Sequence, residues 1–261
     1  MEFKPRLRLL GAEVDVVTPA EVMAFTAARV ASGQRAVVAN HNAHSLYLIR
    51  RDAEMRAFYA RADLIEIDSV PMIAWGRLLG AQVSRAHRCT YLDWREDFWG
   101  LAAREGWRVF HLGCAPGVGE AARAAVLKRH PGVQIAVKHG FFDMAGAENA
   151  QVLSEIAAFQ PHILFVGMGM PRQEAWIAAN FDRLPEAVIF PIGAAFDFEA
   201  GRSTTPPRWT GRLGLEWLHR FAHEPGRLFS RYFVEPWSLL GAAAGDVRRV
   251  VFAREALAAS R

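Results

Sequence analysis

The chain has 261 residues, 52% of them hydrophobic and 22% charged, which indicates an ordinary soluble globular protein with one main core. Its two cysteines, Cys89 and Cys114, form no Cys-x-x-Cys pair, so the sequence offers neither a disulfide framework nor a cysteine zinc site. The basic N-terminus precedes no sustained apolar segment, and nowhere do about 18 uncharged apolar residues follow one another. We expect a cytoplasmic protein that is neither exported nor membrane-spanning.

Along the first 200 residues, short apolar runs alternate with helical patterns, which is typical of parallel β-α units. Strands are expected at residues 36–39, 64–67, 108–112, 134–138, 162–166 and 187–192. Helical stretches between them include residues 42–62, 117–130 and 148–160, each with apolar residues near the helical period. The fold class is therefore α/β, with a Rossmann-like, mostly parallel sheet flanked by helices.

After residue 200 the pattern changes to an amphipathic, basic and aromatic segment without strands. Residues 201–261 hold ten arginines and five acidic residues, whereas residues 1–200 hold 21 basic and 22 acidic residues, so the net charge of +4 comes entirely from the last segment. We expect an α/β domain over residues 1–200 and a C-terminal helical appendage over residues 201–261. Arginines mixed with large aromatics suit a membrane interface or an anionic polymer, or they simply coat a helical surface.

Polar residues follow the first two expected strands, and ligands of open parallel sheets bind beyond the carboxyl ends of strands. Asn40 and Asn42 can bond a ligand or cap the next helix. His41 and His44 lack an apparent third ligand, so no metal is expected. Asp68 is either the cap of the following helix or a rigidly held general base, and the spacing leaves both readings open.

Two bends built on glycine follow later strands. Gly113 and Gly117 flank a turn with Pro116 expected near the first helical position, and Gly167 and Gly169 precede a helix expected to begin at Pro171. Glycines permit close backbone approach and helix N-termini favour anions, so both bends suit an anionic ligand. Tight packing of helix on strand is the alternative. Neither bend carries a dinucleotide fingerprint, and the absence of Gly-Lys-Ser/Thr excludes an ATPase P-loop.

Six stretches in a fixed order resemble the WecG/TagA/CpsF family of bacterial glycosyltransferases over roughly residues 10–235. They read ADLIEIDSVPMIAWGRLLG, HRCTYLD, VFHLGCAPGVGEAA, ILFVGMGMPRQEAWI, IGAAFDFEAGRSTTPPRW and RLGLEWLHRFAHEPGRLFSRYF. The resemblance implies an inverting enzyme that moves a sugar from a UDP-sugar to a hydroxyl on a polyprenyl-diphosphate-linked saccharide, in surface polysaccharide biosynthesis. It also implies that no metal or other cofactor is needed and that residues 1–200 form the catalytic domain.

The resemblance assigns roles residue by residue. Asp68 matches the family's candidate general base, which takes the acceptor proton as the hydroxyl attacks the donor sugar. Arg88 and Thr90 match an Arg-Val-Thr motif, and Arg88 offers a fixed positive charge to the departing diphosphate. Asn42 matches the asparagine of a Thr-x-Asn element.

Gln173 matches the glutamine of a Gly-x-Gly-x-Pro-x-Gln-Glu motif. With backbone N–H groups of the glycine bends it is expected to hold the UDP end of the donor, whereas Glu174 is expected to be a capping or structural residue. Three departures leave the donor sugar open: Asn40 stands where Thr is usual, Ser69 where Gly is usual, and Tyr91-Leu92 replace small residues. N-acetylmannosamine-type and hexose donors both remain possible.

The appendage carries a further set of matches. Four of its arginines match arginines of a family segment thought to dock on the membrane and to close over the active site: Arg212, Arg220, Arg227 and Arg231. We expect a peripheral protein on the inner face of the plasma membrane, with these arginines on lipid or on substrate diphosphates. The same face can instead close a subunit contact in a homo-oligomer.

Three other functions compete with this interpretation. A nucleic-acid binder is disfavoured because residues 1–200 are net negative and carry no known nucleic-acid motif. A Rossmann-type oxidoreductase is supported only by the glycine turns. The nearest alternative is a UDP-sugar enzyme that acts on a soluble acceptor or epimerises its sugar.

Overall fold

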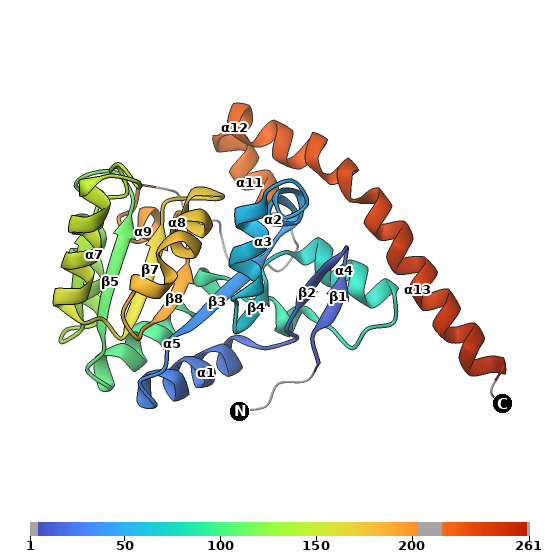
Figure 1. Ribbon diagram of the computed structural model, residues 1–261, viewed down its shortest axis with the longest axis horizontal. Helices are drawn as coiled ribbons and strands as arrows, with labels where there is room; N and C mark the ends of the chain where they lie inside the picture. The colour runs from blue at the N-terminus through green and yellow to red at the C-terminus, as the bar shows by residue number, and fades with distance from the viewer. Residues whose placement is uncertain (1–4, 203–215, 260–261) are drawn as a thin grey trace.

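The computed structural model describes residues 5–202 and 216–259 (Figure 1). Its centre is a six-stranded sheet in the order β4-β3-β8-β7-β5-β6, and every pairing in it is parallel. The strands are β3 (Ala36–His41), β4 (Leu64–Ile67), β5 (Arg108–Gly113), β6 (Gln134–Lys138), β7 (Ile163–Gly167) and β8 (Val188–Pro191). All six lie within two residues of their predicted bounds, so the expected α/β fold with a parallel sheet is confirmed.

Helices cover both faces of this sheet, as a doubly wound fold requires. One face carries α2 (Ala43–Leu48), α3 (Ala53–Ala60), α4 (Val70–Leu78), α7 (Ala147–Phe159) and α8 (Arg172–Asn180). The other carries α1 (Pro19–Ala31), α5 (Tyr91–Arg104), α6 (Val118–Arg129) and α9 (Ala195–Glu199). Two short 3₁₀ turns, η1 (Arg85–His87) and η2 (Phe181–Arg183), complete this part of the chain.

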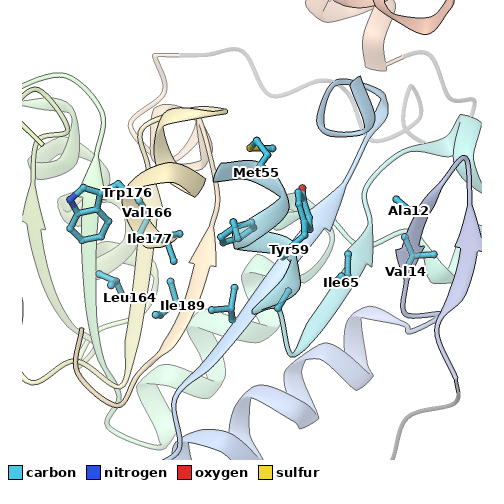
Figure 2. Packing of buried hydrophobic residues seen from close by; sticks show 14 of the residues in the cluster. Ala12, Val14, Met55, Tyr59, Ile65, Leu164, Val166, Trp176, Ile177 and Ile189 are labelled. Carbon is cyan, nitrogen blue, oxygen red and sulfur yellow. The ribbon is translucent and has the colours of Figure 1, made fainter. Parts of the chain in front are cut away.

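Alternate side chains of each strand enter the two apolar cores, because successive strand residues point to opposite faces. In β7, Leu164 and Val166 join one core while Ile163 and Phe165 join the other. Figure 2 shows the first of these cores, with Leu164 and Val166 facing Trp176 and Ile177 of α8. Because both faces are covered, the strands read as continuous apolar runs rather than as alternating ones.

Two helix boundaries differ from the sequence-based expectation. The stretch 42–62 contains two helices rather than one, since the Asp52 carboxylate caps α3 by accepting from the Glu54 and Met55 N–H groups at 2.8 and 3.2 Å. The helix after β5 begins at Val118 with Gly117 as its N-cap at φ +83°. Pro116 was predicted near the first helical position, but the left-handed turn at Gly117 places it before the helix.

A two-stranded hairpin, β1 (Leu7–Leu9) and β2 (Ala12–Val14), precedes the sheet and was not predicted, because strands of three residues carry too short an alternation to detect. Its turn is fixed by a residue from the far end of the chain. Asp246 is buried and accepts hydrogen bonds from the Leu10 N–H at 2.6 Å and from the Trp75 indole at 3.0 Å.

The described part of the appendage consists of α11 (Glu216–His223), α12 (Pro225–Phe229), a π-helical turn η3 (Ser230–Val234), a 3₁₀ segment η4 (Glu235–Leu239) and α13 (Leu240–Ala259). It docks beside α2, where His44 Nδ1 lies 2.6 Å from Glu235 Oε2 and Arg50 donates to the Ser238 carbonyl at 2.8 Å. In Figure 1, α13 runs from this contact past the hairpin and ends away from the sheet. The predicted boundary near residue 200 follows the end of α9 and stays a prediction.

Candidate active site

The carboxyl ends of the six strands lie along one edge of the sheet. From this edge the chain continues into helices that pack on one face of the sheet or on the other. The helices that follow β3 and β7 pack on one face, and those that follow β5 and β8 pack on the other. Neighbouring chain segments therefore diverge at this edge, which is where doubly wound folds bind ligands. The predicted site residues of residues 1–200 lie at this edge, in the exits of β3, β4, β5 and β7, at the starts of the helices that follow or, for Arg88 and Thr90, in the segment before α5.

Asp68 is the first residue after β4, and its backbone N–H donates to the His41 carbonyl at 3.0 Å. Its Oδ2 accepts a hydrogen bond from Asn42 Nδ2 at 3.0 Å. The N-cap of α4 is Ser69, with no side-chain capping bond within the described chain. Of the two sequence-based readings, the structure therefore gives no support to the helix cap and holds the half-buried carboxylate at the edge.

The side chain of Asn42 makes two sets of hydrogen bonds. Its Oδ1 caps α2 by accepting from the His44 and Ser45 N–H groups at 3.0 and 3.1 Å. With Oδ1 committed to these donors, the amide nitrogen must face the other way, toward Asp68. The capping reading of Asn42 is therefore confirmed, and the cap fixes the side chain that holds the Asp68 carboxylate; contact with a ligand stays a prediction.

Arg88 and Thr90 lie beside Asp68 because the chain returns to the end of β4, where Arg88 forms a bridge with Ile67. Arg88 Nε donates to the Asp68 carbonyl at 3.3 Å. The Asp93 carboxylate joins the two predicted residues, accepting from the Thr90 hydroxyl at 2.8 Å and lying 3.9 Å from Arg88 Nη1. A fixed positive charge is therefore held within reach of the aspartate.

A second carboxyl group, Glu66, lies buried in β4 near Asp68. Burial raises the pKa of Glu66 well above its ordinary value, and the nearby charge of Asp68 raises it further. Both effects favour the neutral acid, so Glu66 adds little negative charge beside Asp68. No sequence signal separated this glutamate from an ordinary strand residue.

Asn40 links the ends of β3 and β8 by a side-chain hydrogen bond. The ladder of these strands pairs Ala36 with Val188 and Val37 with Ile189, and beyond it Asn40 Nδ2 donates to the Pro191 carbonyl at 3.3 Å. The Asn40 carbonyl accepts from the Tyr59 hydroxyl at 2.7 Å. The side chain and the carbonyl of Asn40 thus both bond to other parts of the protein. Contact between Asn40 and the donor stays a prediction.

The glycine bends come together at the other end of the edge. Gly113 pairs with Gly167 in the β5–β7 ladder, and a Cβ on Gly113 would lie 2.4 Å from the Gly167 carbonyl oxygen. A Cβ on Gly140, after β6, would lie 2.8 Å from Met168 Cγ. These contacts bring three strand exits together. They are not the tight packing of helix on strand that was the alternative reading, and a Cβ on Gly117 or Gly169 would meet no atom within 4 Å.

These exits line a cavity of about 280 Å³, bordered by Cys114, Ala115, Gly140, Phe141, Gly167, Met168, Arg172 and Asp197. Phe141 is 64% exposed, which leaves an aromatic face open at its rim. Asp197 accepts a weak hydrogen bond from the Cys114 thiol at 3.6 Å. Sequence reasoning missed Phe141 and Asp197, although Asp197 lies within one of the six matched stretches.

Gln173 lies between the two ends and is almost completely buried. Its Oε1 accepts from the Gly169 and Gly193 N–H groups, both at 3.1 Å, and so bridges the exits of β7 and β8. Its Nε2 donates to Glu174 Oε1 at 2.8 Å. We call this set of contacts the Gln173 bridge. Because the Gly169 N–H donates to Gln173, the glutamine side chain holds the shape of the glycine bend. Direct contact between Gln173 and a donor stays a prediction.

One predicted arginine of the appendage reaches this edge. Arg231 in η3 has its Nη2 3.5 Å from Asn42 Oδ1. Arg212 lies outside the described residues, and although Arg220 and Arg227 fall within α11 and α12, their side chains lie outside the described part as well. The structure thus connects the appendage to the predicted site through Arg231.

Residues 7–250 match the model of the glycosyl transferase WecG/TagA/CpsF family. The chain belongs to this family. The match runs from the β1–β2 hairpin into α13, so it includes both ends of the sheet edge and the described appendage.

Two relatives of this family member come from Staphylococcus aureus strains MRSA252 and NCTC 8325 / PS 47. Both are named N-acetylglucosaminyldiphosphoundecaprenol N-acetyl-beta-D-mannosaminyltransferase, and they are 33% and 32% identical to this chain over 135 residues. The aligned segment covers 52% of this chain and 52% of each relative, so the chain matches about half the length of these relatives. Within the described residues, this family member has no helix both long and apolar enough to cross a bilayer.

Proposed function

We propose that the protein is an inverting glycosyltransferase that moves a sugar from a UDP-sugar to a polyprenyl-diphosphate-linked saccharide in surface polysaccharide biosynthesis. The observation that carries this proposal is one sheet edge with a held carboxylate at β4 and a glycine-lined cavity at β5 and β7. Three strand spacings separate β4 from β7, about 14 Å at the usual distance between strands. Family membership supports sugar transfer, and the names of the relatives support a lipid-diphosphate acceptor.

Asp68 is the proposed general base. An inverting transfer needs one carboxylate that takes the proton of the acceptor hydroxyl while the hydroxyl attacks the anomeric carbon from the side opposite the leaving UDP. The hydrogen bond from Asn42 engages Asp68 Oδ2 and leaves Oδ1 for this contact. Arg88 is proposed to stabilise the charge that grows on the departing diphosphate, and Thr90 to help hold the substrate there.

The cavity is the proposed uridine end of the donor site. The exposed ring of Phe141 offers a stacking surface for a base, and the Asp197 carboxylate offers an acceptor for ribose or base N–H and O–H groups. The glycines at its floor allow the ligand to approach the backbone. The diphosphate would then run toward Asp68 past the Gln173 bridge, with Gly117 and the α6 N-terminus beside the cavity.

The appendage is proposed to serve the acceptor and the membrane. Among the described residues, the exposed large hydrophobic side chains outside it are Leu78 and Phe141 alone. Those within it are Trp217, Leu218, Phe229, Phe233, Val234, Trp237, Leu240, Val247, Val251 and Phe252. Such a surface with nearby arginines suits the inner face of the plasma membrane, where each basic residue adds about 1 kcal/mol. Arg212, Arg220, Arg227 and Arg231 are proposed to meet lipid or substrate diphosphates.

Two experiments test these proposals. A panel of UDP-sugars is offered with a polyprenyl-diphosphate monosaccharide, and mass spectrometry reads the product; we expect one donor to extend the lipid. Transfer to water-soluble acceptors alone would replace the lipid acceptor by a soluble one, and no transfer from any UDP-sugar would refute the proposed reaction.

Vesicle flotation tests the proposed membrane contact. The double variant with Trp237→Ser and Phe252→Ser should no longer float with anionic vesicles, whereas Leu78→Ser should float as the wild type does. Loss of self-association without loss of flotation would identify the same surface as a subunit contact.

A further inference from the structure

Cys114 follows β5 in a backbone conformation that suits glycine better than cysteine. Its φ is +61°, in the left-handed region, where a Cβ costs free energy. The backbone hydrogen bonds explain the turn: the Cys114 N–H donates to the Gly167 carbonyl at 3.2 Å, and the Cys114 carbonyl accepts from the Gly140 N–H at 3.0 Å. These bonds need no side chain, so the presence of a thiol at this position requires a separate reason.

The contacts of the thiol indicate this reason. Cys114 and Asp197 both line the cavity of about 280 Å³, and Cys114 Sγ lies 3.6 Å from Asp197 Oδ2. A carboxylate can only accept, so the S–H proton points toward Asp197. Within the described chain, no other side chain donates to this carboxylate. The thiol therefore engages Oδ2 and leaves Oδ1 for other partners.

A second, independent feature lies against the same wall of the cavity. His111 of β5 is completely buried, and its ring stacks on Phe196 of α9 with the ring centroids 3.7 Å apart. His111 Nε2 lies 4.0 Å from Cys114 Sγ, and a Cβ on Gly167 would lie 2.8 Å from the same nitrogen. This edge of the ring thus faces two residues that line the cavity.

The direction of the thiol proton also assigns the tautomer of His111. Burial lowers the pKa of His111 to about 3, so the ring is neutral and carries a single N–H. Since the S–H proton points toward Asp197, the sulfur can only accept from His111 Nε2–H. His111 Nδ1 is then the nitrogen without a proton, and it has no hydrogen-bond partner among the described residues. The three side chains form one directed series from His111 through Cys114 to Asp197.

We propose that Cys114 is a positioning residue of the cavity, whose thiol, backed by His111, holds the Asp197 carboxylate so that Asp197 Oδ1 accepts an O–H or N–H group of a nucleotide ligand. The nature of this ligand rests on the proposed function, whereas the hydrogen bond between Cys114 and Asp197 does not. A reactive thiol is the alternative. Burial and the charge of Asp197 raise the pKa of Cys114 to about 12, which disfavours the thiolate that such reactions need.

The direct test reads the S–H stretching band of the full chain by infrared spectroscopy, because only two cysteines contribute to it. Cys114→Ala assigns the band of Cys114, and Cys89, whose thiol donates to the Val17 carbonyl at 3.3 Å, provides an internal reference. Asp197→Ala should move the Cys114 band to higher wavenumber, since a hydrogen bond weakens the S–H bond. Asp182→Ala, at an exposed aspartate, should leave the band in place. An unmoved band in Asp197→Ala would overturn the proposal.

The second test measures UDP binding by titration calorimetry. Cys114→Ala keeps the Cβ and the strained backbone and removes only the thiol, so it should weaken UDP binding about five- to tenfold. Cys114→Ser keeps a donor and should recover most of this affinity. Cys89→Ala, at the other buried cysteine, is the matched control and should bind UDP as the wild type does. Wild-type affinity in Cys114→Ala, or equal losses in the alanine and serine variants, would overturn the proposal.

A double variant separates positioning from direct contact with the ligand. Adding Cys114→Ala to Asp197→Ala should cause no further loss of UDP affinity, because the thiol acts through that carboxylate. A further loss as large as that of Cys114→Ala alone would overturn the proposal. A wild type that binds no UDP, together with a shifted band in Asp197→Ala, would refute the proposed donor site and leave the hydrogen bond between Cys114 and Asp197 standing.

Discussion

The two ends of the sheet edge are built in opposite ways. At β3 and β4, polar side chains hold one another: Asn42 holds Asp68, and Asp93 joins Arg88 to Thr90. At β5 and β7, glycines remove side chains and leave a cavity of about 280 Å³. A group that moves a proton must be held at a fixed place, whereas a large ligand needs room beside the backbone. The proposed base and the proposed donor site thus differ in the way that their proposed roles require.

The largest expected effect tests the held end. Asp68→Asn should lower kcat by ~10²–10⁴ because the amide cannot take the acceptor proton, while UDP affinity, measured by titration calorimetry, should stay within about twofold. Asp182→Asn, at an aspartate that is 86% exposed, should change neither quantity. Near-normal turnover in Asp68→Asn would assign Asp68 to structure and remove the contrast between the two ends.

The next effect concerns the group between the ends. The folded-state pKa of Glu174, about 7, exceeds its ordinary value of 4.5 because the carboxyl group is buried, so the contribution of this group to stability is fully present below pH 4.5 and is lost as pH rises through 7. The difference corresponds to on the order of 3 kcal/mol. Glu174→Gln should therefore gain stability over the wild type as pH rises from 5 to 8, measured by urea unfolding. Glu120→Gln, on the exposed side of α6, should show no such gain.

A single added methyl group should disrupt the close packing of the strand exits at the glycine end. Gly113→Ala would place a Cβ 2.4 Å from the Gly167 carbonyl oxygen, and the backbone shift that relieves it should cost about 1–3 kcal/mol of unfolding free energy. Gly100→Ala in the middle of α5 meets only the flexible Arg104 side chain at 3.5 Å and should gain stability, since alanine favours helices. Equal stability of the two variants would show that the strand exits are not tightly packed.

The smallest expected effect concerns the rim of the cavity. Stacking of a base on an aromatic ring contributes about 1–3 kcal/mol, and the exposure of Phe141 places its contribution at the lower end. Phe141→Ala should weaken UDP binding about five- to tenfold without changing the melting temperature. Leu78→Ala removes an exposed apolar side chain elsewhere and should leave UDP binding unchanged. Unaltered affinity in Phe141→Ala would move the base out of this cavity.

The sheet could be predicted because its strands are buried on both faces and therefore appear as apolar runs with clear ends. The features that the sequence did not predict depend mainly on contacts between residues far apart in the chain. The β1–β2 hairpin depends on Asp246, which lies 236 residues from Leu10, and no local pattern contains that information. The break between α2 and α3 has a local signal in Asp52, but a continuous helical period across residues 42–62 hid it.

For the site, the position of Asp68 and Asn42 after strands was enough to place them at one edge, since parallel strands bring their carboxyl ends together, whereas Arg88 was assigned through the resemblance alone. Their hydrogen-bond partners were not predictable. Gln173 illustrates the reason: its match to a motif suggested contact with the donor, yet its partners are two loop N–H groups and Glu174. Which side of a residue faces the ligand depends on packing between elements that are distant in sequence.

The buried aspartate of α13 also limits how the C-terminal segment can swing. Lifting α13 from the hairpin would break the hydrogen bonds that Asp246 accepts from the Leu10 N–H and the Trp75 indole, and each broken bond should cost free energy. We therefore expect α13 to stay on the hairpin if the turns that carry Arg231 move.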